Sequence, residues 1–473
     1  MTLEAPPGGF FDPGSFRDPA SRVYFDNGRV ERLLSEEGER HWAALRSTDF
    51  FQRAVESGKL VPTTHEDVEE RDSARHDLPF SPAGKLVHDR VPFWSYPYEW
   101  SFSMLKAAAT LQLDLLAAAL ESRLMIKDAT PYNIAFNGVQ PLFADIGSFR
   151  PYEDGEPWLG YGQFCRLFLF PLMMRAHAGI PFQPLLRGSI DGIAPSHIRS
   201  VMRGRRLFRP GGLTDVLLQA KAERALAHSN RDLRRELTTA GFKIEMIEAN
   251  IRRLQKVVER TNWRPSSSTW SDYGTCGHVG TQRAIKEDLI GRVLLARRHR
   301  LIWDLGANDG HFSKLAAPHA DQVVAADADE FTIDRLFTDL RASGPANVLP
   351  LVLDLANPSP GLGWRGTERR PLEERGRPDL VLVLAILHHL VITANLPLSE
   401  VVAWLASLQA EVILEWVPPD DPMARQIAVN KRAAEIHHDY REDTLRELIT
   451  PRFVVASESP VEGRKLFHLV PRG

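Results

Sequence analysis

Cysteine is scarce in this chain. Only two of the 473 residues are cysteines, Cys165 and Cys276, and neither lies in a CxxC or Cys/His spacing. This excludes a fold stabilised by several disulfides and gives no sign of a cysteine-ligated metal centre. Because isolated thiols are typical of a reducing compartment, we expect a cytoplasmic protein without a metal site.

Long apolar runs, a secretory signal and a strong net charge are also missing. The longest apolar stretch, residues 164–176, is interrupted by two arginines and is shorter than the roughly 20 residues that cross a bilayer. The N-terminal residues lack the basic start and apolar core of a secretory signal. We therefore expect no membrane partner, and the formal net charge of -3 disfavours long nucleic acid.

One stretch is locally basic, and we interpret it as a solvated helix or loop face. It contains Arg199, Arg203, Arg205, Arg206 and Arg209.

What is present is an ordinary globular composition, with 43% hydrophobic and 25% charged residues, which excludes wholesale disorder. A chain of 473 residues exceeds what one hydrophobic core usually supports, so we expect two domains. Residues 1–20 are rich in proline and glycine and are expected to form a flexible arm. Residues 21–250 form the first domain and residues 251–473 the second, with the boundary in or just after a charged helical connector over 214–261.

The first domain has strands before helices. The tripeptide Asp26-Asn27-Gly28 between two short alternating segments predicts a β-hairpin. We expect a helix over residues 36–57, a strand over 85–94 and a long Ala/Leu-rich helix over 101–120. This order is typical of an α+β domain.

The second domain alternates strands with helices. Continuous apolar runs predict strands at residues 301–307, 322–328, 347–355, 378–387 and 411–417. Strands that are apolar on both faces favour a mostly parallel sheet with helices on either side. The second domain is therefore predicted to be α/β and Rossmann-like.

The sharpest motif is a glycine turn, DLGANDG over residues 304–310, at the end of the first of these strands. Glycine lets the backbone approach a ligand closely, and the following helix presents free N–H groups to an anionic group. Asp327 ends the second strand, where an acid can accept the hydroxyls of a ribose, and Asp354 follows the third, where an acid can face adenine. Either acid alone is more typical of an ordinary turn, but their joint occurrence favours a nucleoside site.

The turn does not match the dinucleotide fingerprint. G-x-G-x-x-G requires glycine where this chain has Asn308 and His311, so NAD is disfavoured. The turn instead resembles the G-x-G-x-G motif of class I S-adenosylmethionine (SAM) dependent methyltransferases, with Asn308 in place of the middle glycine, and the resemblance covers about residues 261–467. It implies that SAM is the cofactor and that the two acids bind its ribose and adenine. The methionyl part would be held by Asp304, Gly306, Asn308 and Gly310.

Aromatic and histidine residues complete the site that this resemblance implies. Trp270 and Tyr273 resemble an aromatic lid over the cofactor, with plain packing as the alternative. His388 and His389 lie in the segment that faces the methyl group in the family, so either imidazole is a candidate catalytic base. The alternative is a buried structural histidine, since methyl transfer asks little beyond in-line positioning. Weaker candidates for acceptor contact are Glu415, His437 and Tyr440.

The first domain carries a second pattern. Asp128 is followed five residues later by Asn133, and Asp145 precedes a glycine after two short strand-like runs. This layout resembles the catalytic and metal-binding loops of protein-kinase-like phosphotransferases, which implies that Asp128 orients an acceptor hydroxyl while Asn133 and Asp145 hold Mg²⁺ on ATP. The family's glycine-rich loop is missing, and only Arg32 or Lys85 could replace its strand-borne lysine. We expect a degenerate kinase-like module, and the alternative is that the three residues make turn and capping bonds.

These patterns predict an enzyme that moves a methyl group from SAM to an oxygen or nitrogen acceptor on a small molecule, glycan or peptide. The first domain would help to recognise the acceptor. Two alternatives stay open: a bifunctional kinase and methyltransferase, and a SAM-binding interaction protein without turnover. The identity of the acceptor and the oligomeric state stay open as well, because attached domains and insertions build substrate pockets in this fold.

Overall fold

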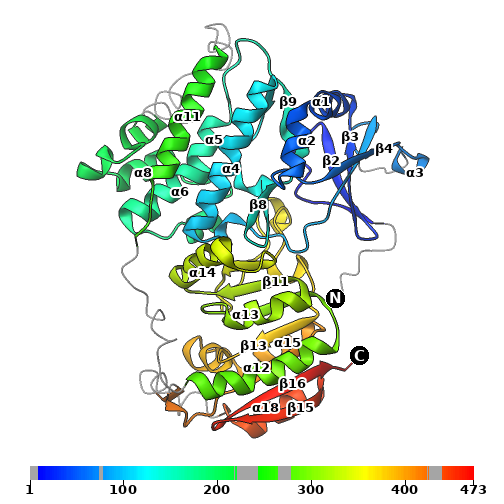
Figure 1. Ribbon diagram of the computed structural model, residues 1–473, viewed down its shortest axis with the longest axis vertical. Coiled ribbons are helices and arrows are strands. Elements are labelled where there is room, and N and C mark those ends of the chain that lie inside the picture. Colours follow the sequence, from blue (N-terminus) through cyan, green and yellow to red (C-terminus); the bar gives the residue numbers. More distant parts are fainter. Residues whose placement is uncertain are drawn as a thin grey trace.

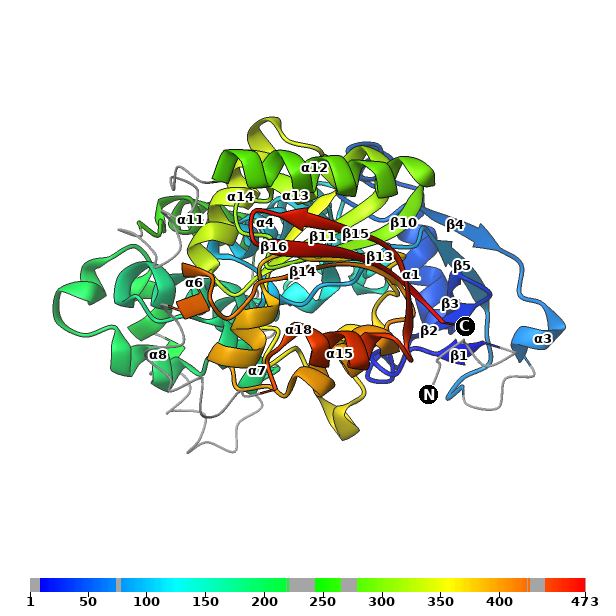
Figure 2. The same ribbon diagram turned by 90° about the horizontal axis from the view of Figure 1, so that it is seen from below.

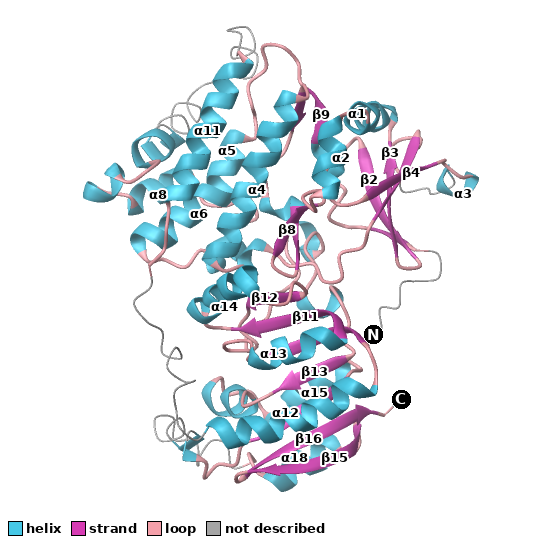
Figure 3. Cartoon of the chain, viewed as in Figure 1, coloured by secondary structure: helices cyan, strands magenta, loops and turns pink. Residues whose placement is uncertain are grey.

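The computed structural model describes residues 9–73, 78–217, 219–220, 243–264, 279–422, 424–425 and 439–472. Within this part of the chain two domains are stacked one above the other (Figure 1). The upper, first domain has its sheet on one side and its helices on the other (Figure 3). The lower, second domain is built around one larger sheet.

The sheet of the first domain is antiparallel, with the order β1-β2-β3-β5-β4. Its strands are β1 (Phe10–Phe11), β2 (Ser21–Asp26), β3 (Arg29–Leu34), β4 (Thr63–Glu66) and β5 (Gly84–His88). Asn27 and Gly28 join β2 to β3, with φ of 46° and 84°. These left-handed conformations make the predicted two-residue hairpin, which is confirmed. The strand predicted over 85–94 is shorter than expected and ends at His88.

Residues 9–20 are ordered, unlike the flexible arm expected over 1–20. β1 pairs with β2, and the ring of Phe10 stacks on Phe25 with centroids 5.3 Å apart. The guanidinium of Arg17 lies 2.6 Å from Glu368 of the second domain. Aromatic side chains gain contact area by adding a strand to the sheet edge, which a composition rich in proline and glycine does not reveal.

Nine α-helices of the first domain can be described within the ranges above. They are α1 (Glu36–Arg46), α2 (Asp49–Glu56), α3 (Glu70–Ser73), α4 (Phe102–Glu121), α5 (Tyr161–Phe164), α6 (Phe170–Met173), α7 (Gln183–Gly188), α8 (Pro195–Val201) and α11 (Ile244–Arg260). The helix expected over 36–57 is two helices, because the Thr48 hydroxyl accepts from the Phe51 N–H and caps a new helix. Two π-helical stretches, η4 (Cys165–Leu169) and η5 (Met174–Ala178), extend α5 and α6 into the buried helical segment predicted over 164–176.

Helix α4 forms the spine of the first domain. It is the long helix predicted over 101–120, and the Ser101 hydroxyl accepts from the Met104 N–H at its start. By length and composition it could cross a membrane, but most of it is buried inside the protein. Helix α11 packs along it, and Gln255 of α11 donates to Asp114 of α4 at 2.8 Å. The predicted boundary after residue 250 therefore falls inside a helix that belongs to the first domain.

Two short strand pairs bring the kinase-like loops together. β6 (Leu124–Ile126) pairs with β9 (Phe149–Pro151), and β7 (Ile134–Asn137) pairs with β8 (Gln140–Phe143). The loops that follow β6 and β8 therefore lie next to each other at one end of these pairs.

The sheet of the second domain has the order β12-β11-β10-β13-β14-β16-β15. Its strands are β10 (His299–Leu305), β11 (Ala320–Asp327), β12 (Val348–Val352), β13 (Leu380–Val383), β14 (Glu411–Trp416), β15 (Phe453–Val461) and β16 (Arg464–Pro471). The first five are parallel and coincide with the predicted apolar runs to within a few residues. β15 and β16 form an antiparallel hairpin that we did not predict. The mostly parallel Rossmann-like sheet is confirmed.

Helices cover both faces of this sheet. They are α12 (Val279–Ala296), α13 (His311–Ala316), α14 (Glu330–Ser343), α15 (Leu398–Ser407) and α18 (Glu442–Ile449). Seen from below, α12, α13 and α14 lie on one side and α15 and α18 on the other (Figure 2). This three-layer arrangement buries both faces of the parallel strands.

The segment between β12 and β13, residues 353–379, reaches into the first domain. The Arg370 N–H donates to the Tyr96 hydroxyl at 2.9 Å, and the Arg369 guanidinium lies 4.3 Å from the centre of the Tyr132 ring. Tyr132 belongs to the loop that carries the kinase-like residues. The second domain therefore covers part of that loop.

Candidate active site

The glycine turn lies where the strand order of the second sheet reverses. β10 is flanked by β11 on one side and by β13 on the other, and its carboxyl end leads directly into the turn. Ligands of open parallel sheets bind outside the carboxyl ends of the strands at such a point. Gly306, Asn308 and Gly310 have φ of 80°, 48° and 72°, which are left-handed conformations that glycine and asparagine adopt at least cost. The turn predicted from the sequence is therefore formed at the ligand-binding edge.

The two glycines also lie close to neighbouring segments. A Cβ atom on Gly310 would lie 2.6 Å from a methyl group of Leu336, and one on Gly306 would lie 3.3 Å from Ile386. Ile386 belongs to the segment after β13 that carries the two histidines. Gly306 therefore brings the turn against this segment, and glycine is needed for packing as well as for access to a ligand.

Asp327 at the end of β11 organises the turn. Its carboxylate accepts from the N–H groups of Asn308 at 3.0 Å and of Asp329 at 2.9 Å. Burial raises the pKa of Asp327, and these backbone donors oppose the shift. The residue is only partly buried, so its oxygens keep lone pairs that can accept the hydroxyls of a ribose.

Asp304, by contrast, forms a hydrogen bond inside the protein. Its side chain is buried, and the Ser313 hydroxyl of α13 donates to it at 2.6 Å. Burial, with a smaller contribution from the charge of Asp327, raises the pKa of Asp304 to about 7. Asp304 thus ties the end of β10 to the first turn of α13.

Asp354 is exposed after β12. One of its carboxylate oxygens accepts from the Ala356 N–H at 2.9 Å, as in an ordinary turn. The contact with adenine stays a prediction for this residue.

The rings of His388 and His389 lie next to each other after β13, with centroids 4.2 Å apart. His388 is 1% exposed, and neither of its ring nitrogens has a hydrogen-bond partner among the described residues. Burial, with smaller contributions from His389 and Arg464, lowers the pKa of His388 to about 3. Burial lowers the pKa of His389 as well. Both rings are therefore neutral near pH 7, and His388 is as buried as a structural histidine although its ring nitrogens have no partner among the described residues.

A buried ion network lies beside His388. Glu415, at the end of β14, pairs with Lys286 of α12 at 2.7 Å and with Arg464 of β16 at 3.2 Å. Arg464 also pairs with Asp421 at 2.8 Å. Both oxygens of Glu415 face these cations, so it ties α12 and β16 to β14. Contact of Glu415 with an acceptor stays a prediction.

The remaining sequence candidates of the second domain add little to this geometry. Three of them, Trp270, Tyr273 and His437, lie outside the described residues. Tyr440 is buried, and its hydroxyl donates to a backbone carbonyl at 2.8 Å. In the part of the chain that the structure describes, no three His, Cys, Asp or Glu side chains are grouped to hold a metal ion.

The residues of the kinase-like pattern lie together in the first domain. One oxygen of Asp145 accepts from the Asn133 amide at 3.1 Å and from the Ser148 hydroxyl at 2.5 Å. The other oxygen pairs with Arg32 of β3 at 2.9 Å. Both oxygens of the acid that would hold metal ions are therefore occupied by groups of the protein itself.

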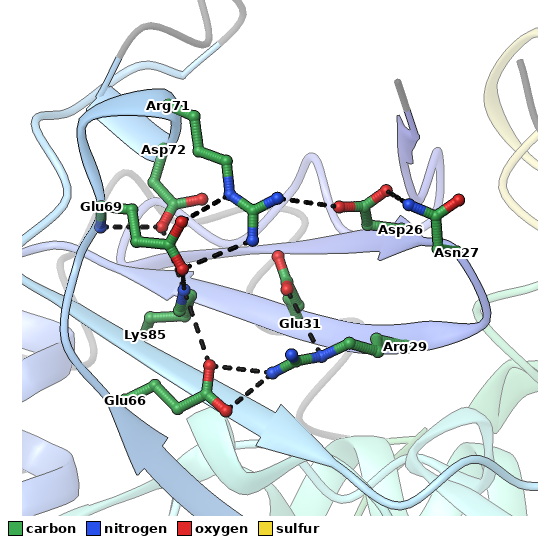
Figure 4. Close-up of polar contacts among 9 residues, drawn as sticks. All are labelled: Asp26, Asn27, Arg29, Glu31, Glu66, Glu69, Arg71, Asp72 and Lys85. Atoms are coloured by element: carbon green, nitrogen blue, oxygen red, sulfur yellow. Dashed lines mark hydrogen bonds and ion pairs between the residues drawn. The ribbon is translucent and has the colours of Figure 1, made fainter. Parts of the chain in front are cut away.

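Lys85 is not the cation that reaches Asp145. It is fully buried on β5, and its ammonium lies 3.1 to 3.6 Å from three carboxylates (Figure 4). These belong to Glu66, Glu69 and Asp72. Of the two candidates that we considered for the strand-borne cation, Arg32 is the one at the kinase-like loops.

Asp128 differs from Asp145 in that its carboxylate is unpaired among the described residues. It is accessible to solvent, and its carboxylate has no hydrogen-bond or ion-pair partner within the described ranges. Desolvation and then the charge of Asp145 raise the pKa of Asp128.

Several residues at these two sites could not be found from the sequence. Lys286 stands in a helix without a motif, and Arg464 and Asp421 join the network only because β16 returns beside β14. Ser313 lies in the helix after the glycine turn, where a hydroxyl facing the strand-end acid could have been suspected.

Known proteins similar to this chain were found by sequence and by structure. No family model matches the chain. The chain is 32% identical over 468 residues to the nodulation protein NoeA of Rhizobium meliloti (strain 1021), and the match covers 96% of this chain and 94% of that protein. The match therefore runs through both domains.

Solved methyltransferase structures are similar to part of this chain. The N-methyltransferase NodS of Bradyrhizobium japonicum WM9 is 12% identical over 40% of this chain and 97% of its own, with a TM-score of 0.29. Magnesium protoporphyrin IX methyltransferase of Synechocystis PCC 6803 is 18% identical over 44% of this chain and 90% of its own, with a TM-score of 0.29. The bifunctional kinase-methyltransferase WbdD is 20% identical over 44% of this chain and 42% of its own, with a TM-score of 0.30. At such TM-scores the fold assignment depends on the strand order described above.

Proposed function

The chain belongs to the family of the nodulation protein NoeA, and from this premise we propose that it is a SAM-dependent methyltransferase whose first domain helps to recognise the methyl acceptor. The match to NoeA includes the first domain, so the proposal assigns a role to both halves of the chain.

The observation that carries the proposal is the glycine turn, with Asp327 beside it, at the point where the strand order reverses. The left-handed turn opens toward the carboxyl edge of the sheet, and Asp327 is held in place by the Asn308 N–H. A carboxylate fixed beside such a turn fits a ribose, and the N–H groups at the start of α13 suit a carboxylate. These features fit an amino acid joined to a nucleoside, which is the chemistry of SAM.

The reaction needs few groups from the protein. SAM supplies a methyl group on a sulfonium, so that a bond from the acceptor oxygen or nitrogen forms as the carbon–sulfur bond breaks. The protein's part is to hold the acceptor in line, to exclude water and to take up the acceptor's proton. His388 and His389 are neutral and lie next to Ile386, which contacts the glycine turn, so they are our candidates for orienting the acceptor.

In the first domain we assign acceptor recognition instead of phosphoryl transfer. Arg32, Asn133 and Ser148 already use three of the roughly four lone-pair sites of Asp145, and the charge of Arg32 opposes a Mg²⁺ ion there. The carboxylate of Asp128, unpaired in the part of the chain that the structure describes, can accept a hydrogen bond from a hydroxyl or an amine of the methyl acceptor. The acceptor class is a small molecule, a glycan or a peptide that carries such groups.

Calorimetric titration of SAM tests the proposal first. We expect micromolar binding to the wild type and at least tenfold weaker binding to Asp327→Ala, because a hydrogen bond to a charged group contributes about 1.5 to 3 kcal/mol. Asp321→Ala is the matched control, since this exposed acid lies at the other end of the same strand and should leave the affinity unchanged. Absence of SAM binding to the wild type would refute the assignment of the second domain.

Turnover separates the enzyme from a SAM-binding interaction protein. Incubation with SAM and panels of hydroxyl- and amine-bearing acceptors should release S-adenosylhomocysteine. SAM binding without release in any panel, together with full biological activity of a variant lacking both His388 and His389, would favour the non-catalytic alternative.

A further inference from the structure

A basic, apolar-tipped surface lies in the first domain, outside both sites described above. We call it the basic tip and define it by Arg203, Arg205, Arg206, Phe208 and Arg209. Phe208 is 79% exposed, which is more than any other large hydrophobic residue in the described ranges. The four arginines are exposed as well. Arginines flank this exposed phenyl ring on both sides in sequence.

The basic tip is built on a fixed base. Met202, directly before it, is fully buried. After it, the buried carboxylate of Asp215 receives two hydrogen bonds of 2.7 Å from Arg253 of α11 and one of 2.6 Å from the Tyr161 hydroxyl. Between these anchors Gly204 has open space around its Cα atom. The tip is therefore a projecting, preorganised turn.

Its position leaves it accessible. The neighbouring helix α8 lies at one edge of the molecule, opposite the strands β1 to β5, in both views (Figures 1 and 2). The second domain lies below this edge in Figure 1. A large flat partner could therefore approach the tip without meeting the second domain first.

The positive charge of the basic tip is not neutralised within the described residues. None of its arginines forms an ion pair with a described carboxylate, whereas Arg253, Arg175 and Arg375 each do. The sequence from Arg199 to Leu213 contains five arginines and no acidic residue, while the whole chain has a formal net charge of -3. The tip is thus a local concentration of positive charge on an acidic protein.

We propose that the basic tip docks the protein on the surface of an anionic phospholipid bilayer. Phe208 and the 47% exposed Leu213 enter the headgroup region, and the arginines bind lipid phosphates. A bilayer fits better than a long nucleic acid, because the apolar apex needs an apolar phase and the acidic remainder of the chain would repel an extended polyanion. The proposal is independent of the methyltransferase assignment. It differs from our sequence-based expectation of no membrane partner, because the exposure of side chains cannot be predicted from the sequence.

Vesicle co-sedimentation of the full chain tests this docking. We expect binding to phosphatidylcholine vesicles that contain phosphatidylglycerol and none to phosphatidylcholine alone. R205E together with R206E should lower the partition coefficient more than tenfold, since each charge near such a surface contributes about fivefold. R205K with R206K should keep most of the binding, and F208A should lower it without changing its dependence on salt.

A matched control is available on the second domain. Trp364 is 65% exposed and is followed by the exposed Arg365, but the next arginines, Arg369 and Arg370, are only partly exposed and follow the acidic Glu368. W364A with R365E should therefore leave vesicle binding unchanged. Each variant should keep the wild-type melting temperature and SAM affinity, because only exposed side chains are altered.

Two results would overturn the proposal. One is equal binding of wild type and R205E/R206E to anionic vesicles. The other is the absence of vesicle binding together with arginine-dependent binding of a short RNA or DNA duplex, which would assign the basic tip to nucleic acid.

Discussion

Arg375 of the second domain forms a two-point ion pair with Glu99 of the first domain, with both N–O distances at 2.6 Å. Each side chain is 1% exposed. Arg375 also donates to the Trp94 carbonyl, and the Ser359 hydroxyl donates to Glu99. Charges removed from water are tolerated when they are paired and hydrogen-bonded, as the Glu99 carboxylate and the two terminal nitrogens of Arg375 are here. The ion pair therefore fixes how the two domains sit against each other.

Breaking this pair should destabilise the whole protein. Glu99→Gln is expected to lower the free energy of unfolding by about 3 to 5 kcal/mol, because it leaves the Arg375 guanidinium buried without its counter-charge. Asp321→Asn is the control, since it removes the exposed ion pair with Arg298 and should cost at most about 1 kcal/mol. Urea unfolding of both variants provides the measurement. Equal costs would mean that the domain interface is maintained by other contacts.

The glycine turn provides a second prediction. Gly310→Ala should cost stability twice over, through its positive φ and through the approach of the new Cβ to Leu336 at 2.6 Å. Gly463→Ala isolates the first effect, because Gly463 has φ of 85° and its new methyl group would have no atom within 4 Å. We expect about 1 kcal/mol for Gly463→Ala and about 2 to 4 kcal/mol for Gly310→Ala. Thermal unfolding measures the difference, and calorimetry should find weaker SAM binding for Gly310→Ala alone.

The sequence predicts what depends on local periodicity and turn chemistry. The Asn27-Gly28 hairpin, the parallel strands and the glycine turn are all encoded by neighbouring residues. It does not reveal that β16 returns next to β14 and brings Arg464 to Glu415, because that contact joins residues far apart in the chain.

The kinase-like loops illustrate the same limit. Asp128, Asn133 and Asp145 could be found from their spacing, but the sequence left Arg32 and Lys85 as equal candidates for the missing lysine. The choice depends on which face of the sheet each side chain occupies, and a one-residue difference in strand register reverses the face.

The pairing of Arg32 with Asp145 predicts that the first domain does not bind ATP with Mg²⁺. Titration of ATP and Mg²⁺ into the wild type should give no magnesium-dependent heat, because the guanidinium already neutralises the carboxylate that would hold the metal. In Arg32→Ala that carboxylate is released, so any weak metal binding should be seen there first. Magnesium-dependent ATP binding to the wild type that is lost in Asp145→Ala would instead support the bifunctional kinase and methyltransferase.

Asp304 and His388 should give the protein opposing pH dependences. The folded-state pKa of Asp304 is about 7, above its unfolded value of about 3.9, so the folded state binds the extra proton between these values. The contribution of Asp304 to the free energy of unfolding therefore falls as the pH rises from about 4 to about 7. The folded-state pKa of His388 is about 3, below its unfolded value of about 6.5, so its contribution rises with pH between those values.

Single substitutions should separate the two contributions to the pH dependence of stability between about pH 4.5 and about pH 6.5. The free energy of unfolding of Asp304→Asn minus that of the wild type should increase as the pH rises. The same difference for His388→Phe should decrease. Each slope is at most about 1.4 kcal/mol per pH unit. Asp304→Asn keeps an acceptor for Ser313, and His388→Phe removes nitrogens that have no partner among the described residues, so both variants should fold. Urea unfolding across this pH range measures the two slopes. If Asp304→Asn leaves the slope unchanged, Asp304 is ionised in the folded protein and its burial is compensated by the N–H and hydroxyl donors of Ser313.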